Sequence, residues 1–214
     1  MPGHDVSRAR TPDDCAISNS AATSDVTAAT PFPTGAYLGV MRQQAGTEFR
    51  TKFWDQLFPS QIPTERVEAA EIPADGFTLE GERPLPIEVG HSDTDDTTVL
   101  WVPSMRLAVA GDVVHNGVHQ YLSESQGGGR DAWRRALDRV QALDPAHVIA
   151  GHKDPARDDT PAAIDLTRQY LDGVDRLLAK DPNSRDFFRQ MLEIYPDWIN
   201  PGALWGGAVT LLGA

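Results

Sequence analysis

Apolar and polar positions follow two different spacings along the chain, and each spacing predicts one type of element. Alternation with a period of two is typical of strands, whereas apolar residues three and four apart are typical of helices. Short apolar runs bounded by turn residues predict strands over residues 76–80, 85–89, 97–102, 106–110 and 147–151. Because Pro103 and Ser104 separate two of these runs, the sequence predicts a tight hairpin there.

Helical spacing occurs before, between and after these strands. It predicts helices over residues 36–57, with a break at Gly46, and over 131–143, 160–178 and 184–195. Thr160 and Ser184 are the predicted N-caps of the last two helices, and Pro161 is predicted at the first helical position. Apolar residues farther on are predicted to anchor the tail: Trp198, Leu204 and Trp205. Strands followed by helices, twice, predict an α/β fold with helices against one face of a sheet.

Composition and charge restrict the class of protein. A chain of 214 residues with 40% hydrophobic and 23% charged residues is typical of one soluble globular domain. Its net charge of -12 argues against nucleic acid and anionic membranes as partners, because both would be repelled. Cys15 is the only cysteine, so no internal disulfide can form. With no membrane-spanning run and no signal-peptide pattern, we expect a cytoplasmic protein.

The first residues differ from the rest of the chain. Residues 1–26 are polar, rich in Ser, Thr, Ala and Asp, and show neither period. This pattern predicts a disordered tail. Residues 27–214 are predicted to form the folded domain.

Three of the apolar runs end in glycine followed by a side chain that can bind a metal. The three side chains are those of His91, Asp112 and His152. Each comes directly after a glycine, which has no Cβ that would obstruct a sharp bend or a bound ion. Strand ends at one edge of a sheet are where α/β folds usually carry their chemistry. The sequence therefore predicts that these three side chains converge in one polar site.

These residues lie within a longer series of motifs: GHSDTDDTTVLWVP, LAVAGDVVHNGVHQYL and VIAGHKDP. The series resembles the C-terminal half of a metallo-β-lactamase-fold hydrolase, and the resemblance covers residues 27–214. It implies an αββα sandwich with one or two metal ions, usually zinc, between the sheets. It further implies that His91 binds the first metal, that Asp112 bridges both and that His152 binds the second.

One motif of the family is missing from this sequence. The H-x-H-x-D-H motif normally precedes the first of these turns, but the only histidine before His91 is His4. We therefore expect an incomplete αββα sandwich from a truncated or frame-shifted gene, with an exposed sheet that favours homo-oligomers. The resemblance leaves each metal without its full set of ligands.

Other polar residues surround the three predicted ligands in sequence. Asp93, Asp95 and Asp96 are predicted second-shell carboxylates, because a metal-bound imidazole normally donates its other N–H to such a group. His115 and His119 are predicted to line the pocket, with a role as substitute ligands as the alternative. Their spacing of four suits a helical clamp, but the Asn-Gly pair between them weakens helix formation.

The resemblance implies zinc-dependent hydrolysis of an ester, lactone, thioester or amide bond in a small molecule, with Asp112 as the catalytic residue. Zinc lowers the pKa of a bound water to about 7, so that hydroxide can attack a carbonyl carbon. No G-x-S-x-G elbow is present and no base accompanies Cys15, which argues against a serine or cysteine hydrolase. The missing ligands predict impaired activity. The alternatives are a non-catalytic remnant and a module that binds one metal through His91, Asp112 and His152.

Overall fold

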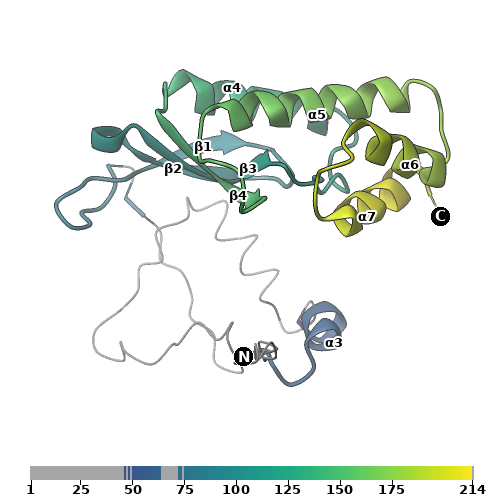
Figure 1. The fold of residues 1–214 in the computed structure, drawn as a ribbon. Coiled ribbons are helices and arrows are strands. Elements are labelled where there is room, and N and C mark those ends of the chain that lie inside the picture. The colour runs from purple at the N-terminus through teal and green to yellow at the C-terminus, as the bar shows by residue number, and fades with distance from the viewer. Residues whose placement is uncertain (1–45, 47, 49, 64–71, 74, 214) are drawn as a thin grey trace, which may run out of the picture.

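The fold is built on a four-stranded sheet in a computed structural model that describes residues 46, 48, 50–63, 72–73 and 75–213. The strands are β1 (Leu85–Gly90), β2 (Thr97–Val102), β3 (Leu107–Asn116) and β4 (His147–Lys153), and they lie side by side in that order (Figure 1). β1–β2 and β2–β3 pair antiparallel, whereas β3–β4 pair parallel. Four of the five predicted strands and the hairpin are therefore confirmed.

The hairpin between β2 and β3 turns through a short 3-10 helix, Pro103–Met105. Arg106 follows it with a φ of 47°, and its N–H donates to the carbonyl of Pro103. The proline fixes the φ that the first position of such a turn needs. The predicted Pro-Ser turn thus forms, one residue longer than the dipeptide itself.

The predicted strand over residues 76–80 is wrong. In this stretch Leu79 and Glu82 form a single isolated bridge, with backbone hydrogen bonds of 3.0 and 2.9 Å. Glu80 and Gly81 between them both have positive φ, 52° and 89°, as a type I′ turn requires. The chain therefore reverses before a ladder can extend.

Two helices cover one face of the sheet. They are α4 (Gly129–Ala142), which connects β3 to β4, and α5 (Ala162–Leu178), and Figure 1 shows both running across the same side. Their apolar stripes meet the sheet in a core that includes Trp133, Leu137, Leu171, Val99 and Val148. The Trp133 Nε1–H donates to the carbonyl of Val113 in β3 at 2.8 Å, which fixes α4 against the strand. The predicted α/β class, with helices against one face of the sheet, is therefore confirmed.

The last two helices pack beside the sheet rather than over it. They are α6 (Ser184–Ile194) and α7 (Pro201–Leu212), and they contact each other at one end of the molecule (Figure 1). The N-cap of α6 is Asn183 rather than Ser184, because the Asn183 side chain accepts the Asp186 N–H at 2.8 Å. α5 begins at Ala162, after Pro161 rather than after Thr160. The sequence predicted only an anchored tail where the structure has the helix α7.

The N-terminal part contributes two short elements to the described chain. A π-helix spans Arg50–Trp54 and runs into α3 (Asp55–Leu57), so that part of the predicted helix 36–57 forms. The predicted disordered tail over residues 1–26 lies outside the described residues. None of the helices in the described ranges has the length and apolar character needed to cross a membrane.

Candidate functional site

Asp112 and His152 come together where β3 and β4 run side by side. The Asp112 Oδ1 and His152 Nε2 atoms are 3.5 Å apart. The ladder between the two strands is irregular on both sides of Gly111, whose φ of 52° marks a bulge that shifts the following residues. A Cβ on Gly151 would overlap the Asp112 Oδ1 atom, so the carboxylate occupies the space that a side chain at this position would fill.

A pocket of about 190 Å³ opens beside Asp112. Asp93, which is 9% exposed, contributes a second carboxylate, and the Ser92 hydroxyl donates to it at 3.0 Å. Burial, and to a lesser extent the nearby charge of Asp112, raises the pKa of Asp93 to about 6. The remaining walls are small or apolar: Thr94, Thr97, Thr98, Val109, Ala110, Gly111 and Val113. The pocket therefore concentrates negative charge and suits a cation or a proton.

The His91 ring is oriented by an acidic neighbour in the same turn. Its Nδ1 lies 2.6 Å from Asp95 Oδ1, and this partner assigns the proton to Nδ1. Nε2 is buried without a hydrogen-bond partner, and a Cβ on Gly129 would approach it to 2.9 Å. An imidazole held by a carboxylate, with its other nitrogen free, has the arrangement of a metal ligand. Asp96 lies exposed in the same turn, with a φ of 57°.

His115 lies beside the Asp112–His152 contact. Its ring stacks on that of His152, with centroids 5.6 Å apart, and it also contacts Trp133 at 5.7 Å. Burial, and to a lesser extent the neighbouring His152, lowers the pKa of His115 to about 3, so the ring is neutral. Its Nδ1 is buried without a partner. The Thr167 hydroxyl oxygen accepts the His115 backbone N–H at 3.0 Å and holds this part of β3 against α5.

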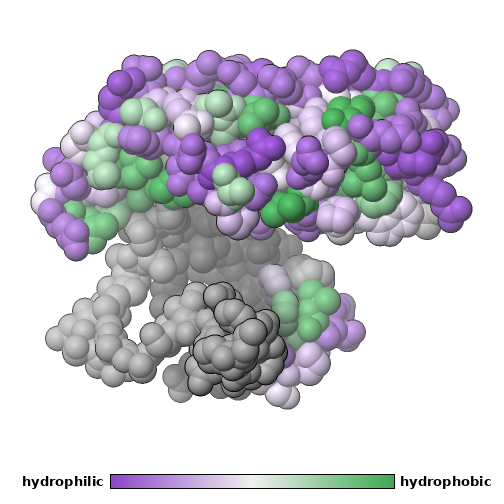
Figure 2. Space-filling model, in the orientation of Figure 1, coloured by the Kyte–Doolittle hydropathy of each residue, from purple (hydrophilic) through white to green (hydrophobic). Residues whose placement is uncertain are grey.

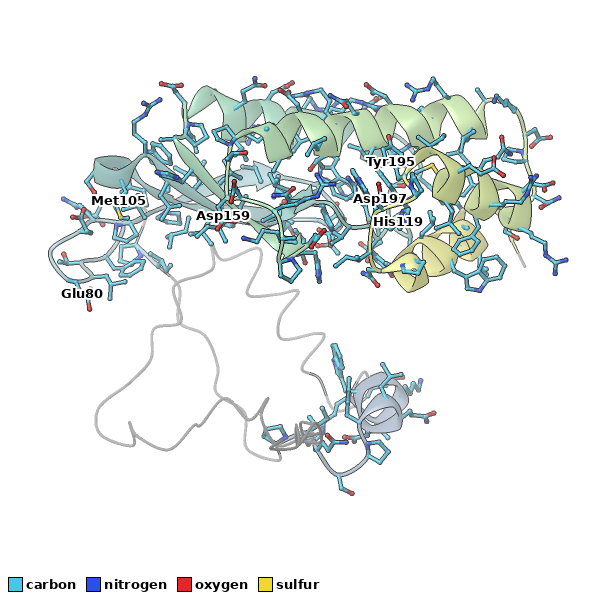
Figure 3. All side chains as sticks on the ribbon, viewed as in Figure 1. Glu80, Met105, His119, Asp159, Tyr195 and Asp197 are labelled. Atoms are coloured by element: carbon cyan, nitrogen blue, oxygen red, sulfur yellow. The ribbon has the colours of Figure 1, made fainter. Side chains whose placement is uncertain are left out.

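His119 belongs to a different cluster. Its Nδ1 lies 3.1 Å from the Tyr170 hydroxyl, and its ring contacts Trp198 at 6.2 Å. Burial raises the pKa of Tyr170, so its hydroxyl keeps its proton, and we assign this hydroxyl as the donor to His119 Nδ1. Figure 3 labels His119 and Tyr195 in this part of the molecule, toward α6 and α7.

The sequence-based prediction of the site can be compared with these positions. Asp112, His152 and His115 lie together, Asp93 shares the pocket with Asp112, and Asp95 holds His91. Across the described residues, no three His, Cys, Asp or Glu side chains form a group that could hold a metal ion. Convergence of all three predicted ligands stays a prediction. Sequence reasoning missed Thr167, although a polar residue within the buried stripe of α5 was a usable signal.

Comparison with known proteins identifies the family. The model of the metallo-beta-lactamase superfamily matches residues 20–152. A metallo-beta-lactamase from Pontibacter korlensis is 15% identical, with a TM-score of 0.40, over 63% of this chain and 62% of that one. A metallo-beta-lactamase family protein from Thermus thermophilus is 17% identical, with a TM-score of 0.49, over 79% of this chain and 60% of that one.

The chain spans about three fifths of the length of these two solved structures. No curated protein matches it. The family match covers more than half of the chain and includes the motifs around His91, Asp112 and His152. The chain therefore belongs to the metallo-β-lactamase superfamily.

Proposed function

We propose that this chain is a metal-dependent hydrolase in which Asp112 and His152 hold one divalent metal ion, zinc by family, and hold it weakly. The observation that carries the proposal is the 3.5 Å separation between Asp112 Oδ1 and His152 Nε2. Two donors at about 2.0–2.2 Å from a tetrahedral zinc lie about 3.4 Å apart, so this pair fits one edge of such a site.

The other candidate ligands fit a zinc site less well than Asp112 and His152 do. A catalytic zinc site uses about three protein ligands, and the described residues contain no group of three His, Cys, Asp or Glu side chains that could serve. His91 has a free, buried Nε2 and remains the predicted third ligand. His115 has a free Nδ1 next to the His152 ring, which makes it the alternative third ligand. We infer weak binding because only two donors already meet.

The family and the pocket both support the substrate class that we propose. Bound zinc would supply a water of lowered pKa and polarise a carbonyl group. We propose esters, lactones, thioesters or amides of small molecules as substrates, since a pocket of about 190 Å³ holds one acyl group rather than a polymer. Asp93 lines this pocket beside Asp112, so its carboxylate is placed to accept a proton there.

Low turnover is part of the proposal. A metal held by two side chains keeps more of its water and is less firmly placed than one held by three. A displacement of the reacting groups by about 1 Å can cost roughly 100-fold in rate. The competing possibility is a non-catalytic remnant, in which Asp112 and His152 form only an ion pair and bind no metal.

Zinc binding and turnover of Asp112→Ala, compared with the unchanged chain, test the proposal. We expect weak zinc binding in a competition titration and slow, zinc-dependent hydrolysis within a panel of the four bond types, both lost in Asp112→Ala and in His152→Ala. Asp165→Ala, an exposed acid on α5, is the control and should leave both properties intact. Equal zinc binding by the unchanged chain and Asp112→Ala would show that the pair holds no metal.

Fast turnover that Asp112→Ala abolishes would separate the two parts of the proposal. It would support the assigned reaction and show that the metal is held by a complete ligand set. His91→Ala and His115→Ala then identify the third ligand, because only the true ligand weakens zinc binding as strongly as His152→Ala.

A further inference from the structure

Arg157 is a cation without a partner in a chain whose net charge is -12. Its guanidinium forms no ion pair or hydrogen bond with the residues that the structure describes. Three other described arginines also lack such partners, and they are all exposed: Arg135, Arg176 and Arg185. Arg157, in contrast, is partly buried. Because a guanidinium that loses water needs new acceptors, this arginine has the environment of a ligand-binding residue.

The Arg157 side chain lies across Gly117, just after the end of β3. A Cβ on Gly117 would come within 2.2 Å of the Arg157 Nε atom and 3.0 Å of its Cζ atom. Gly117 also has a φ of 73°, which other residues rarely adopt. The missing side chain therefore leaves the space that the guanidinium occupies. None of the guanidinium nitrogens is fully buried, so a ligand can reach them.

The loop after β4 is tied to β3 on both sides of Arg157. The Arg157 N–H donates to the Asp154 carbonyl at 3.0 Å, and the Asp154 N–H donates to the Asn116 carbonyl at 2.8 Å. The Asn116 side chain in turn donates to the Asp158 carbonyl at 3.0 Å. The backbone that carries the guanidinium is therefore fixed before any ligand binds, which lowers the cost of ordering it.

The carboxylates of this loop do not neutralise Arg157. The Asp154 Oδ1 atom accepts a backbone N–H within the loop at 2.9 Å. Asp159, which is labelled in Figure 3, pairs with Lys153 at 2.8 Å. Asp158 is exposed and forms no ion pair with its neighbour Arg157. The loop therefore leaves the guanidinium available to an anion from outside the chain.

Arg157 lies farther along β3 than the pair of predicted metal ligands. Residues 109–113 of this strand line the pocket, and His115 then pairs with His152 in the β3–β4 ladder. Gly117, on which the guanidinium lies, follows two residues later, and two residues of a strand span about 7 Å. The order along β3 is therefore the pocket, the candidate metal site and the guanidinium.

We propose that Arg157 binds a carboxylate on the leaving group of the substrate. The inference rests on the proposed hydrolase function, which places the acyl group in the pocket and the carbonyl at Asp112 and His152. The leaving group then extends along β3 toward the guanidinium. A planar guanidinium matches a carboxylate through two parallel hydrogen bonds, and charge-assisted hydrogen bonds are about twice as strong as neutral ones. The preferred substrates are therefore anionic, although the net charge of the chain repels anions.

Binding of 4-hydroxybenzoate tests this subsite without turnover. The neutral 4-hydroxybenzamide has nearly the same shape and is the matched probe. By NMR titration of the zinc-free full chain, we expect 4-hydroxybenzoate to bind at least ~10-fold more tightly than the amide, and Arg157→Gln to remove this preference. Arg135→Gln is the control, because it removes the same charge from α4, whose outer side is hydrophilic surface in Figure 2. It should retain the preference.

The matched esters 4-acetoxybenzoate and 4-acetoxybenzamide test the same contact during hydrolysis by the zinc-loaded chain. Arg157→Gln should lower the ratio of kcat/KM for the anionic ester to that for the neutral ester by about 10–100-fold. Arg157→Lys keeps the charge but loses the planar fork, so it should restore part of this ratio.

Two results would overturn the subsite: equal binding of the two probes by the unchanged chain, and a preference that persists in Arg157→Gln. A preference lost equally in Arg135→Gln would also overturn it, because the effect would then come from overall charge. An Arg157-dependent preference in a chain that hydrolyses neither ester would support the subsite and contradict only the hydrolase function. Hydrolysis of both esters without any binding preference would contradict only the subsite.

Discussion

His119→Asn should make the stability of the protein less sensitive to acid. His119 is 1% exposed, and its Nδ1 accepts a hydrogen bond from the Tyr170 hydroxyl while its Nε2 lacks a partner. The Oδ1 atom of an asparagine can take over the acceptor role of Nδ1, but the amide does not titrate in this range. The substitution therefore removes a titrating group while it keeps a hydrogen-bond partner for Tyr170.

The magnitude follows from the pKa of His119, which burial lowers from 6.5 to about 4. Between pH 6.5 and pH 4 the unfolded chain binds a proton at this site more readily than the folded chain does. The free energy of unfolding therefore falls as the pH decreases through this window. At about 1.4 kcal/mol per unit of pKa difference, the full loss from His119 is about 3 kcal/mol by pH 4.

Urea unfolding at pH 7.5 and at pH 4.5 measures this effect as a difference between two proteins. At pH 7.5 we expect His119→Asn to be less stable, because the ring contact with Trp198 is lost. That deficit should shrink by about 2–3 kcal/mol at pH 4.5, since groups such as Asp93 and His115 titrate in both proteins and cancel. His147→Asn, at an exposed position, is the control. A deficit that stays constant with pH would refute the reasoning.

Two further substitutions test the packing around the site. Gly151→Ala should lower the unfolding free energy by about 1–3 kcal/mol and weaken zinc binding, because its Cβ would overlap the Asp112 Oδ1 atom; an unchanged melting temperature and zinc affinity would contradict this. Trp133→Phe should cost about 1–3 kcal/mol in urea unfolding, because the buried Val113 carbonyl loses its 2.8 Å donor. A cost below ~0.5 kcal/mol would show that another donor replaces the indole.

The elements that the sequence predicted well are those whose signals are local and agree with one another. The β2–β3 hairpin has two apolar runs and a proline at the turn, and α4 has an apolar stripe through Trp133, Ala136, Leu137 and Val140. α7 lacked such a signal, because a helix that is apolar on both faces has no 3.6-residue period. The remaining sign of its start was Asn200 before Pro201 at the first helical position.

The candidate site was predicted in part for a related reason. Asp112 and His152 were predicted directly after two strand ends, but β3 and β4 continue through both residues. The two side chains still meet, because these strands are parallel neighbours in the sheet. His115 and His119 are four residues apart, which suggested a shared environment. They separate because the His115 backbone stays in β3, bound to Thr167, while the chain beyond Gly117 turns toward Trp198 and the Ile199 bridge.

The contact between Asp112 and His152 depends on two glycines, one next to Asp112 in its own strand and one in the neighbouring strand. Gly111 adopts a φ of 52° within its own strand, where a side chain would be strained, and so permits the bulge before Asp112. Gly151 lies in the neighbouring strand, and its missing Cβ leaves the space that the Asp112 carboxylate occupies. The first requirement can be inferred from a Gly-Asp turn in the sequence. The second depends on which residue of β4 faces Asp112, and this register is fixed by packing between α4, β3 and β4. The glycine before one predicted ligand, His152, can therefore make room for another, Asp112, in the neighbouring strand. No pattern within a single strand specifies this relation.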